Sequence, residues 1–324
     1  MENNILVTGS SGFIGKYFID FILNKNNYEK IFLISRKNIS GSIAMDSPFI
    51  KIHCDLKKKI NFRLKVNTVI HIAAETRFKD SIYDVNYLGT KNLLNWSIKN
   101  KIKKFIFVSS VSVYGADNKS GKIDEMTKCL PKTLYGKSKS DAENLVINQC
   151  NDANIKYVII RPTSVLGVMD NNRYPLLGLI KSIKNRYFFY FGEGLQYFNY
   201  ISVEDLVYCI KYFIDNDFRN KIFILNDPIT LKSAVNAIAN KLDQPTPKII
   251  LPYWAGHLFG KMGDKIKNIT KRAAPFDSDK FFELTNETFY DGNLITEETK
   301  FRYQYGIKST LIEIINYYIK KRVL

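Results

Sequence analysis

The sequence predicts an α/β fold in which a doubly wound parallel sheet carries a smaller C-terminal α/β lobe. In the first half, short apolar runs alternate with amphipathic stretches of helical period, and this rhythm indicates βαβ units. The apolar runs are largely apolar on both faces, as strands buried on both sides of a parallel sheet require. The chain has 324 residues, of which 45% are hydrophobic, so it can bury a large core and still form an appended lobe.

The predicted elements follow one another in regular order. Strands of the first half are expected at residues 4–8, 30–35, 49–53, 68–73, 104–110 and 156–162. Amphipathic segments such as 13–25 and 84–100 lie between them and predict the covering helices. The rhythm loosens after Pro162. In this second part we expect helices at 203–216, 231–243 and 310–321, and one further strand at 221–225.

Residues 253–272 form an amphipathic and basic stretch that has two interpretations. One is contact with a membrane surface. The other is a lobe helix that packs by its apolar side and exposes a cationic side to solvent. The second interpretation is favoured, because runs of charge are usually solvated.

The charge of the chain agrees with an anionic partner. A formal net charge of +17 and a pI near 9.5 suit a nucleotide, a polyphosphate or a membrane surface. A general enrichment in lysine explains the same charge. Because no nucleic-acid-binding motif occurs, we expect no nucleic acid partner.

The cysteine and hydropathy patterns exclude several classes. Four cysteines lie far apart, at Cys54, Cys129, Cys150 and Cys209, so we expect neither a disulfide framework nor a zinc site. With three histidines in the chain, no metal site is expected. No run of roughly 18 or more apolar residues occurs, and a strand begins within a few residues of Met1. We therefore expect a soluble, cytoplasmic protein without an integral membrane segment.

A glycine triplet follows the first predicted strand and opens a helix. Gly9, Gly12 and Gly15 allow a tight turn and leave backbone N–H groups accessible to a pyrophosphate at the start of the helix. This context predicts a dinucleotide site. We expect residues 1–165 to form the NAD(P)-binding domain. Residues 166–324 are expected to form mostly a substrate-binding lobe, partly interleaved with it.

The end of the second predicted strand indicates which dinucleotide is bound. An NAD site of this kind usually has an acidic residue here, which accepts hydrogen bonds from the ribose 2′-hydroxyl. This chain has Arg36 and Lys37 after Ser35. The basic pair suits a 2′-phosphate, so NADP is favoured and NAD remains possible.

Several ordered motifs make the chain resemble the extended short-chain dehydrogenase/reductases of the Rossmann fold, and among them the nucleotide-sugar epimerases, dehydratases and reductases. The motifs cover nearly the whole chain: "TGSSGFIG", "CDL", "HIAA", "VNYLGTKNLL", "VSSVSVYG", "YGKSK", "RPTSVLG" and "YISVEDLV". The resemblance implies cofactor contacts at Gly9, Gly12, Phe13, Ile14, Gly15, Asp55, Leu56, Ala73, Tyr135, Lys139 and Pro162.

The order of the motifs selects one of three Tyr-x-x-x-Lys pairs. Tyr135 and Lys139 follow the strand that ends in two serines, whereas Tyr87/Lys91 and Tyr317/Lys321 lie on other predicted helices. Four-residue spacing puts Tyr135 and Lys139 on one helix face. A neighbouring ammonium is expected to favour the phenolate, and the resemblance implies that Lys139 also holds the nicotinamide ribose.

The hydroxyl that bonds the reacting alcohol or ketone is assigned by the same resemblance. It implies Ser110, with Ser109 the weaker candidate. Related 4,6-dehydratases carry an Asp-Glu pair directly after this hydroxyl. Here those positions are Val111 and Ser112, which disfavours dehydration.

Two reactions then remain nearly equal. A reductase of a 4-keto nucleotide sugar is slightly favoured by Arg36, and an NAD-dependent 4-epimerase is the alternative. The C-terminal third resembles sugar epimerases of surface-polysaccharide pathways. Further alternatives are an enzyme similar to 3β-hydroxysteroid dehydrogenases or dihydroflavonol reductases, and a non-catalytic NADP sensor.

The substrate-binding residues and the oligomeric state are the least determined. Motif position places seven side chains near the substrate: Glu75, Thr76, Arg77, Ser112, Thr163, Arg173 and Tyr200. Each has a surface or packing role as its alternative. The resemblance implies a homodimer formed by the helices that carry Asn86 and Tyr135, with Asn86 either near the active site or packed on backbone.

Overall fold

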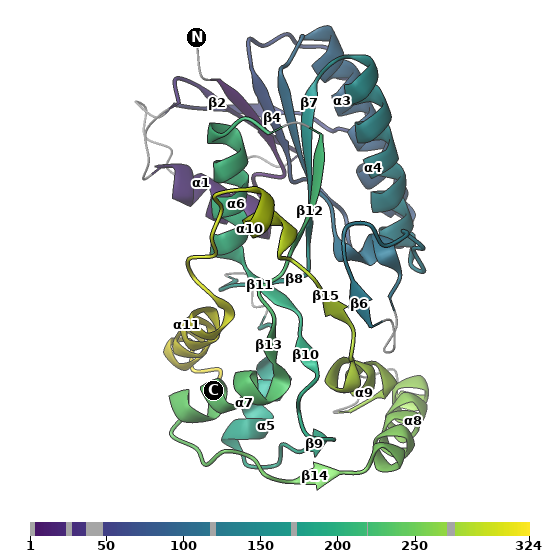
Figure 1. Cartoon of the computed structure of the whole chain (residues 1–324), viewed down its shortest axis with the longest axis vertical. Coiled ribbons are helices and arrows are strands. Elements are labelled where there is room, and N and C mark those ends of the chain that lie inside the picture. Colours follow the sequence, from purple (N-terminus) through teal and green to yellow (C-terminus); the bar gives the residue numbers. More distant parts are fainter. Residues whose placement is uncertain are drawn as a thin grey trace.

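The computed structural model describes residues 4–23, 28–36, 48–116, 121–169, 174–218, 220–270 and 276–324. Its centre, in this part of the chain, is a parallel sheet of seven strands in the order β12-β7-β5-β4-β1-β2-β3 (Figure 1). The strands are β1 (Ile5–Thr8), β2 (Ile31–Ser35), β3 (Phe49–His53), β4 (Thr68–His71), β5 (Lys104–Val108), β7 (Lys156–Pro162) and β12 (Lys221–Leu225). The predicted doubly wound parallel sheet is confirmed.

The strands are apolar on both faces because helices cover both sides of the sheet. All residues of β1, β2 and β4 are buried, whereas the edge strand β3 buries Phe49 and exposes residues on both faces. In the central register Val7 pairs with Leu33 on one side and with Ile70 on the other. The winding reverses between β1 and β4, so the connections that follow them run to opposite faces of the sheet and leave room for a ligand.

Two helical layers cover the sheet (Figure 1). On one face lie α1 (Phe13–Leu23) and α6 (Val203–Asp215), and Phe18 of α1 is fully buried there. On the other face lie α2 (Lys79–Tyr83), the π-helical turn η1 (Asp84–Leu88), α3 (Gly89–Lys99) and α4 (Leu134–Asp152). Leu93 of α3 and Val146 of α4 bury their side chains against this second face.

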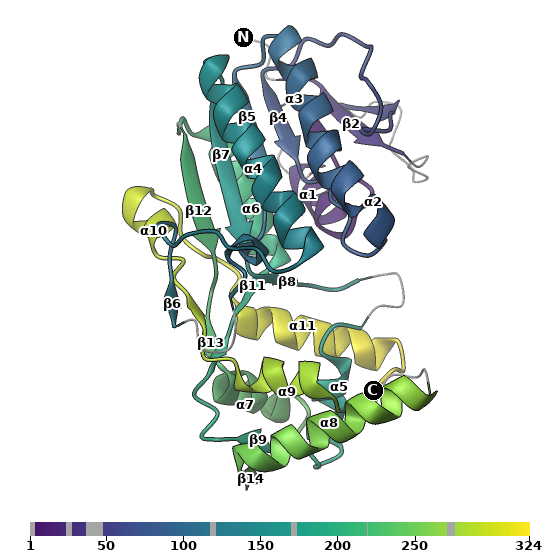
Figure 2. The same cartoon turned by 90° about the vertical axis from the view of Figure 1, so that its right-hand side faces the viewer.

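The second lobe lies beyond the carboxyl ends of the strands (Figure 2). Its helices are α5 (Leu177–Lys184), α7 (Leu231–Lys241), α8 (Tyr253–Thr270), α9 (Ser278–Thr285) and α11 (Ile307–Lys320). Its own core includes Ile180, Ile238 and Ile314 from α5, α7 and α11. Short strands connect the helices: β9 (Tyr190–Phe191), β10 (Tyr197–Phe198), β13 (Ile229–Thr230), β14 (Ile250–Leu251) and β15 (Phe289–Tyr290).

The remaining elements link the two lobes. They are the 3₁₀ turn η2 (Val111–Tyr114), β6 (Lys122–Ile123), β8 (Ser164–Leu166), β11 (Tyr200–Ser202) and α10 (Leu294–Glu298). The buried carboxylate of Asp205 in α6 accepts backbone N–H bonds from Gln304 (2.7 Å) and Gly306 (3.0 Å). Asp205 therefore fixes the segment that leads into α11, which explains a carboxylate in the "YISVEDLV" motif.

The structure corrects several predicted boundaries. β4 ends at His71 and β5 at Val108, each two residues earlier than expected, because the chain leaves the sheet there at its carboxyl end. The helix expected at 310–321 begins three residues earlier, at Ile307. Within the described ranges, no helix is both long and apolar enough to cross a membrane.

Candidate active site

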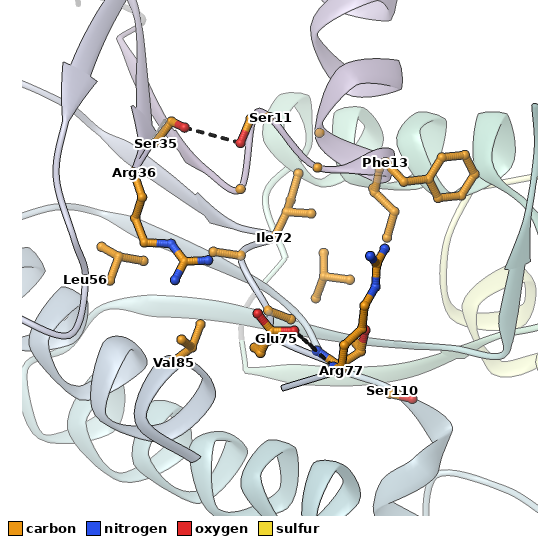
Figure 3. A pocket seen from close by; sticks show the side chains of 18 of the residues that line it. Ser11, Phe13, Ser35, Arg36, Leu56, Ile72, Glu75, Arg77, Val85 and Ser110 are labelled. Atoms are coloured by element: carbon orange, nitrogen blue, oxygen red, sulfur yellow. Dashed lines mark hydrogen bonds between the residues drawn. The ribbon is translucent and has the colours of Figure 1, made fainter. Parts of the chain in front are cut away.

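A cavity of about 650 Å³ lies at the carboxyl ends of β1 and β4, where the winding reverses (Figure 3). Most of the residues predicted to bind the cofactor line it: Gly9, Gly12, Phe13, Ile14, Gly15, Arg36, Asp55, Leu56, Ala73, Tyr135 and Pro162. Lys139 is buried against Val108, which is itself a lining residue. Lys37 lies outside the described residues.

The glycine loop leaves no space for side chains. Gly9 has φ +76°, and a Cβ there would lie 2.6 Å from the backbone nitrogen of Ala73. A Cβ on Gly15 would lie 2.1 Å from the carbonyl oxygen of Gly9. The loop therefore packs tightly on the turn after β4, and α1 begins at Phe13 with its N-terminus at the cavity. This arrangement fits the pyrophosphate of a dinucleotide.

The end of β2 contributes hydroxyls and a guanidinium to the same cavity. The side chain of Ser35 donates a hydrogen bond to Ser11 Oγ (3.2 Å), which joins the strand end to the glycine loop. Arg36 extends from this point across the cavity towards Leu56 (Figure 3). Arg77, from the turn after β4, reaches into the cavity from another side. Two guanidinium groups favour an anionic ligand.

The turn after β4 is held by Glu75 and Asn86. The Glu75 carboxylate accepts backbone N–H bonds from Thr76 (3.0 Å) and Arg77 (2.9 Å). Burial raises the pKa of Glu75. The backbone hydrogen bonds and the charge of Arg36 lower the same pKa by a larger amount, so its net shift is downward. Asn86 accepts the Glu75 N–H at 2.7 Å and donates to Ser138 Oγ at 2.9 Å. Asn86 thus connects the turn to α4.

Ser110 and Tyr135 face the cavity from two neighbouring elements. Ser110 ends the chain segment after β5 and caps η2, since its Oγ accepts the N–H of Ser112 at 3.1 Å. Thr133 caps α4 by accepting the N–H of Gly136 at 3.0 Å, which places Tyr135 in the first helical turn. Burial raises the pKa of Tyr135, and a side-chain hydrogen bond with Ser110 lowers it in part.

Lys139 behaves differently from the prediction. Its Nζ donates to the Val108 carbonyl at 2.6 Å and lies 4.1 Å from the centre of the Phe107 ring. Burial lowers the pKa of Lys139 to about 7, and it also lowers the pKa of the neighbouring His71 to about 3. The expected ammonium effect on the Tyr135 phenolate is therefore wrong for this structure, in which burial is the larger influence and raises the phenol pKa.

A buried ion pair lies one helical turn beyond Lys139. Arg161 of β7 donates from Nε to Glu143 Oε1 (3.0 Å) and from Nη2 to Oε2 (2.6 Å). Its Nη1 donates to the Tyr114 hydroxyl at 2.7 Å. The charge of Glu143 raises the pKa of Lys139 and so partly opposes the effect of burial. Arg161 of the "RP" motif therefore contacts α4 one turn after the "YGKSK" motif.

A second cavity of about 390 Å³ adjoins the first. Thr163 lines both cavities, and Ser112 of the second is hydrogen-bonded to Ser110 of the first (Oγ to Oγ, 3.1 Å). Of the substrate candidates, Ser112, Thr163 and Tyr200 line the second cavity, whereas Glu75, Thr76 and Arg77 line the first. Arg173 lies outside the described residues.

Sequence reasoning missed several residues of this second cavity: Lys132, Thr133, Leu176, Leu179, Tyr197, Asn199, Leu284, Asn286 and Tyr290. They come from separate segments: the N-terminal end of α4, the start of α5, the short strands β10 and β15 with the residue after β10, and the end of α9. Asn226 fixes two of the walls, because it donates to Asn199 Oδ1 (3.1 Å) and its own Oδ1 accepts from Thr163 (3.0 Å).

The other two Tyr-x-x-x-Lys pairs lie away from both cavities. Tyr87 stacks on Tyr83 with ring centres 5.0 Å apart. Lys321 lies 5.6 Å from the ring centre of its own partner, Tyr317. Among the described residues, no group of three or more His, Cys, Asp or Glu side chains is placed to hold a metal ion.

A parallel sheet with a glycine loop at its switch point, and a Tyr-x-x-x-Lys helix beside a strand that ends in serine, characterises the extended short-chain dehydrogenase/reductases. The protein is an enzyme of this class. More narrowly, residues 5–225 match the NAD dependent epimerase/dehydratase family, and the chain belongs to that family.

Three known proteins are similar to this chain in sequence or in fold. The chain is 30% identical over 281 residues to a UDP-glucose 4-epimerase of Vibrio cholerae, covering 82% of this chain and 84% of that protein. It is 29% identical over 307 residues to the N-acetyl-alpha-D-glucosaminyl-diphospho-ditrans,octacis-undecaprenol 4-epimerase of Escherichia coli O157:H7, covering 91% and 89%. The fold is similar to that of a UDP-glucuronic acid 4-epimerase from Bacillus cereus in complex with NAD, with TM-score 0.71, 21% identity and 99% and 100% coverage.

Proposed function

We propose that this protein is an NAD(P)-dependent 4-epimerase that acts on a hexose carried by a diphosphate group. The observation that carries the proposal is the position of Ser110 and Tyr135. They face the dinucleotide-shaped cavity, and Ser112, hydrogen-bonded to Ser110, lines the adjoining second cavity. Val111 and Ser112 stand where dehydration would need carboxyl groups. Both relatives described above are 4-epimerases, which supports the assignment.

The proposed cofactor site uses groups that the chain holds ready. Backbone N–H groups of Phe13 and Ile14 at the start of α1 would bind the pyrophosphate, and Asp55 and Leu56 would border the adenine. Ser109 Oγ is buried at this cavity with no hydrogen-bond partner in the described structure, as expected of a group that a ligand completes. When bound, the nicotinamide supplies the hydride acceptor and donor.

The proposed proton chemistry belongs to Tyr135. As a phenolate, its Oη would take the proton of the sugar 4-hydroxyl during oxidation, and the resulting phenol would return it on reduction, while Ser110 Oγ orients the same oxygen. Lys139, with a pKa lowered to about 7, exists in both charge states near neutral pH. It would donate to the nicotinamide ribose beside Val108, whose carbonyl already fixes its Nζ.

The substrate is assigned to the second cavity. Apolar walls from Leu176, Leu179 and Leu284 alternate there with the polar groups of Asn199 and Lys132. This lining suits a sugar ring whose diphosphate meets a cation. The named relatives support both a uridine diphosphate and a polyprenyl diphosphate as the carrier.

The test is to incubate purified protein with UDP-glucose or UDP-N-acetylglucosamine. The configuration at C4 is then read by proton NMR from the hydrogen on that carbon. Inversion to the galacto isomer without net consumption of cofactor is the expected result. Reduction of a 4-keto sugar with one NADPH consumed per product, and no inversion of either substrate, would replace the proposal with the reductase.

The reductase stays a second candidate because of Arg36, whose side chain extends into a cavity that Ser11 and Ser35 also line. These groups suit a 2′-phosphate. If NADP is the cofactor, Arg36→Asp weakens NADPH binding about tenfold or more and improves NADH binding, since a charge-assisted bond becomes a repulsion. Titration of protein fluorescence with each cofactor measures this change.

The control for that titration is Arg63→Asp, which makes the same charge change at an exposed residue outside the cavity. An equal loss in both variants, or unchanged NADPH affinity in Arg36→Asp, contradicts the preference for NADP.

Two architectural assignments belong to the same proposal. Residues 1–165 act as the NAD(P)-binding domain and residues 166–324 mostly as the substrate lobe, interleaved through β12. A homodimer would form through α3 and α4, whose outer surfaces expose Ile98 and Leu134.

A further inference from the structure

Helix α8 is held to the rest of the lobe by small residues. Ala255, Gly256, Gly260 and Gly263 are its buried positions, and they face α9. A Cβ on Gly256 would lie 2.1 Å from the ring of Phe281. This close approach fixes which side of α8 points inwards. The favoured interpretation, a helix that packs by its apolar side and exposes a purely cationic side, is therefore wrong. Small residues of α8 pack against the lobe, and the large apolar side chains are exposed.

The outer side of α8 carries a row of large apolar side chains. Trp254, Leu258, Met262, Ile266 and Ile269 expose 69, 51, 54, 48 and 71% of their surface. The first four are spaced by four residues, so they lie on one side of the helix, one above another. An exposed apolar row of this length is unusual for a surface in contact with water alone.

Lysines run along the same row. Lys261 and Lys265 are exposed and lie one residue before Met262 and Ile266, at the edge of the apolar side chains. The acidic residue of α8, Asp264, is turned to α9, where it accepts the N–H of Ser278 at 3.3 Å. The outer side of α8 is therefore apolar and cationic at once.

We propose that α8 is a membrane-docking helix that lies in the plane of an anionic phospholipid surface. Apolar side chains, with a tryptophan at one end, would enter the headgroup boundary, and Lys261 and Lys265 would meet lipid phosphates. A second copy of the chain fits this surface less well, because a two-fold contact sets the same lysines against each other in a protein of net charge +17.

The place of α8 gives the docking a direction. In both views α8 lies at the outer end of the second lobe, away from the N-terminus (Figures 1 and 2). It packs on α9, and Leu284 and Asn286 at the end of α9 line the second cavity. Docking therefore brings that cavity near the lipid surface. The inference does not depend on which sugar the enzyme converts.

Vesicle binding by the full chain tests the inference. The probes are vesicles of phosphatidylglycerol and phosphatidylcholine in equal parts, and vesicles of phosphatidylcholine alone. The chain has two tryptophans, and Trp96 is buried, so a blue shift of emission on binding reports Trp254. We expect cosedimentation and a blue shift with the anionic vesicles, both weaker at high salt.

The variant Leu258→Glu/Met262→Glu should lose binding about tenfold or more, because two apolar side chains that would enter the lipid become charged. Leu130→Glu/Met126→Glu is its matched control, since it makes the same exchanges at exposed positions of the other lobe. Lys261→Gln/Lys265→Gln should weaken binding to the anionic vesicles about fivefold for each lysine. Circular dichroism and turnover of a soluble sugar nucleotide should be unchanged in all three variants.

Three results would overturn the inference. The first is an absence of binding and of a blue shift with the wild-type protein. The second is an equal loss of binding in the Leu130→Glu/Met126→Glu control. The third is a wild-type dimer in sedimentation velocity that Leu258→Glu/Met262→Glu separates, with no vesicle binding by either protein, because the row would then be a protein interface.

Discussion

Tyr135→Phe is expected to lower kcat by about 10²–10⁴-fold, the usual contribution of a positioned acid or base. The phenol of Tyr135 faces the cofactor cavity and is hydrogen-bonded to Ser110. Phenylalanine keeps the ring and its packing and removes only the hydroxyl. Affinity for the dinucleotide should therefore stay within about twofold.

Steady-state turnover and fluorescence titration of cofactor binding measure the two quantities separately. Tyr87→Phe is the matched control, because Tyr87 also begins a Tyr-x-x-x-Lys sequence but stacks on Tyr83 instead of facing the cavity. Activity of Tyr135→Phe close to that of the wild type would remove Tyr135 from the proton chemistry. A common loss in both variants would point to a general effect of phenol removal.

Arg161→Met is expected to lower the free energy of unfolding by about 3–5 kcal/mol, the range found when one partner of a buried ion pair is removed. The side chains of Arg161 and Glu143 are 5% and 3% exposed, so water cannot replace the lost partner. Glu143 would keep a buried charge, and the Tyr114 hydroxyl would lose its donor. Urea unfolding followed by circular dichroism gives the difference.

The double variant Glu143→Leu/Arg161→Met is the decisive comparison. It removes both charges, so it should recover much of the stability lost in the single variant. A double variant as unstable as Arg161→Met would show that packing, and not the unpaired carboxylate, causes the loss. Lys156→Met, which breaks an exposed pair with Asp217, should change stability by less than about 1 kcal/mol.

The sheet could be predicted from the sequence because its signals are local. Strands buried on both faces are continuous apolar runs, and all seven predicted runs, including residues 221–225, became strands of one sheet. The cofactor cavity was predictable for the same reason. Gly9, Gly12 and Gly15 belong to one strand-to-helix turn, and Arg36 directly follows the next strand.

The second cavity could not be predicted because its lining residues are far apart in the sequence. Ser112, Asn199 and Asn286 meet there from three separate segments, and strands of two residues carry no period. The pKa of Tyr135 was missed for another reason. Four-residue spacing shows that Lys139 is near, but it does not show that Lys139 turns to a backbone carbonyl in a buried place.

The sequence correctly predicted that α8 is amphipathic, but it did not predict which side of the helix packs against the lobe. The pattern shows two sides of a helix without telling which side packs. Here the glycines, Gly256, Gly260 and Gly263, form the inner side because they allow the closest approach to α9. Large side chains were assumed to be buried, and at this helix they are the exposed ones.

The position of β12 has a consequence for how the chain acquires its fold during synthesis. β7 is complete at Pro162, but its outer neighbour, residues 221–225, is made only after the first part of the second lobe. Until then β7 is an unpaired edge strand whose apolar side chains are meant for the core. Such an edge can pair with strands of other chains. A ribosome that stalls between Met169 and residue 221 therefore leaves a nascent chain that is prone to aggregation. The residues that line the cofactor cavity have all been made by then.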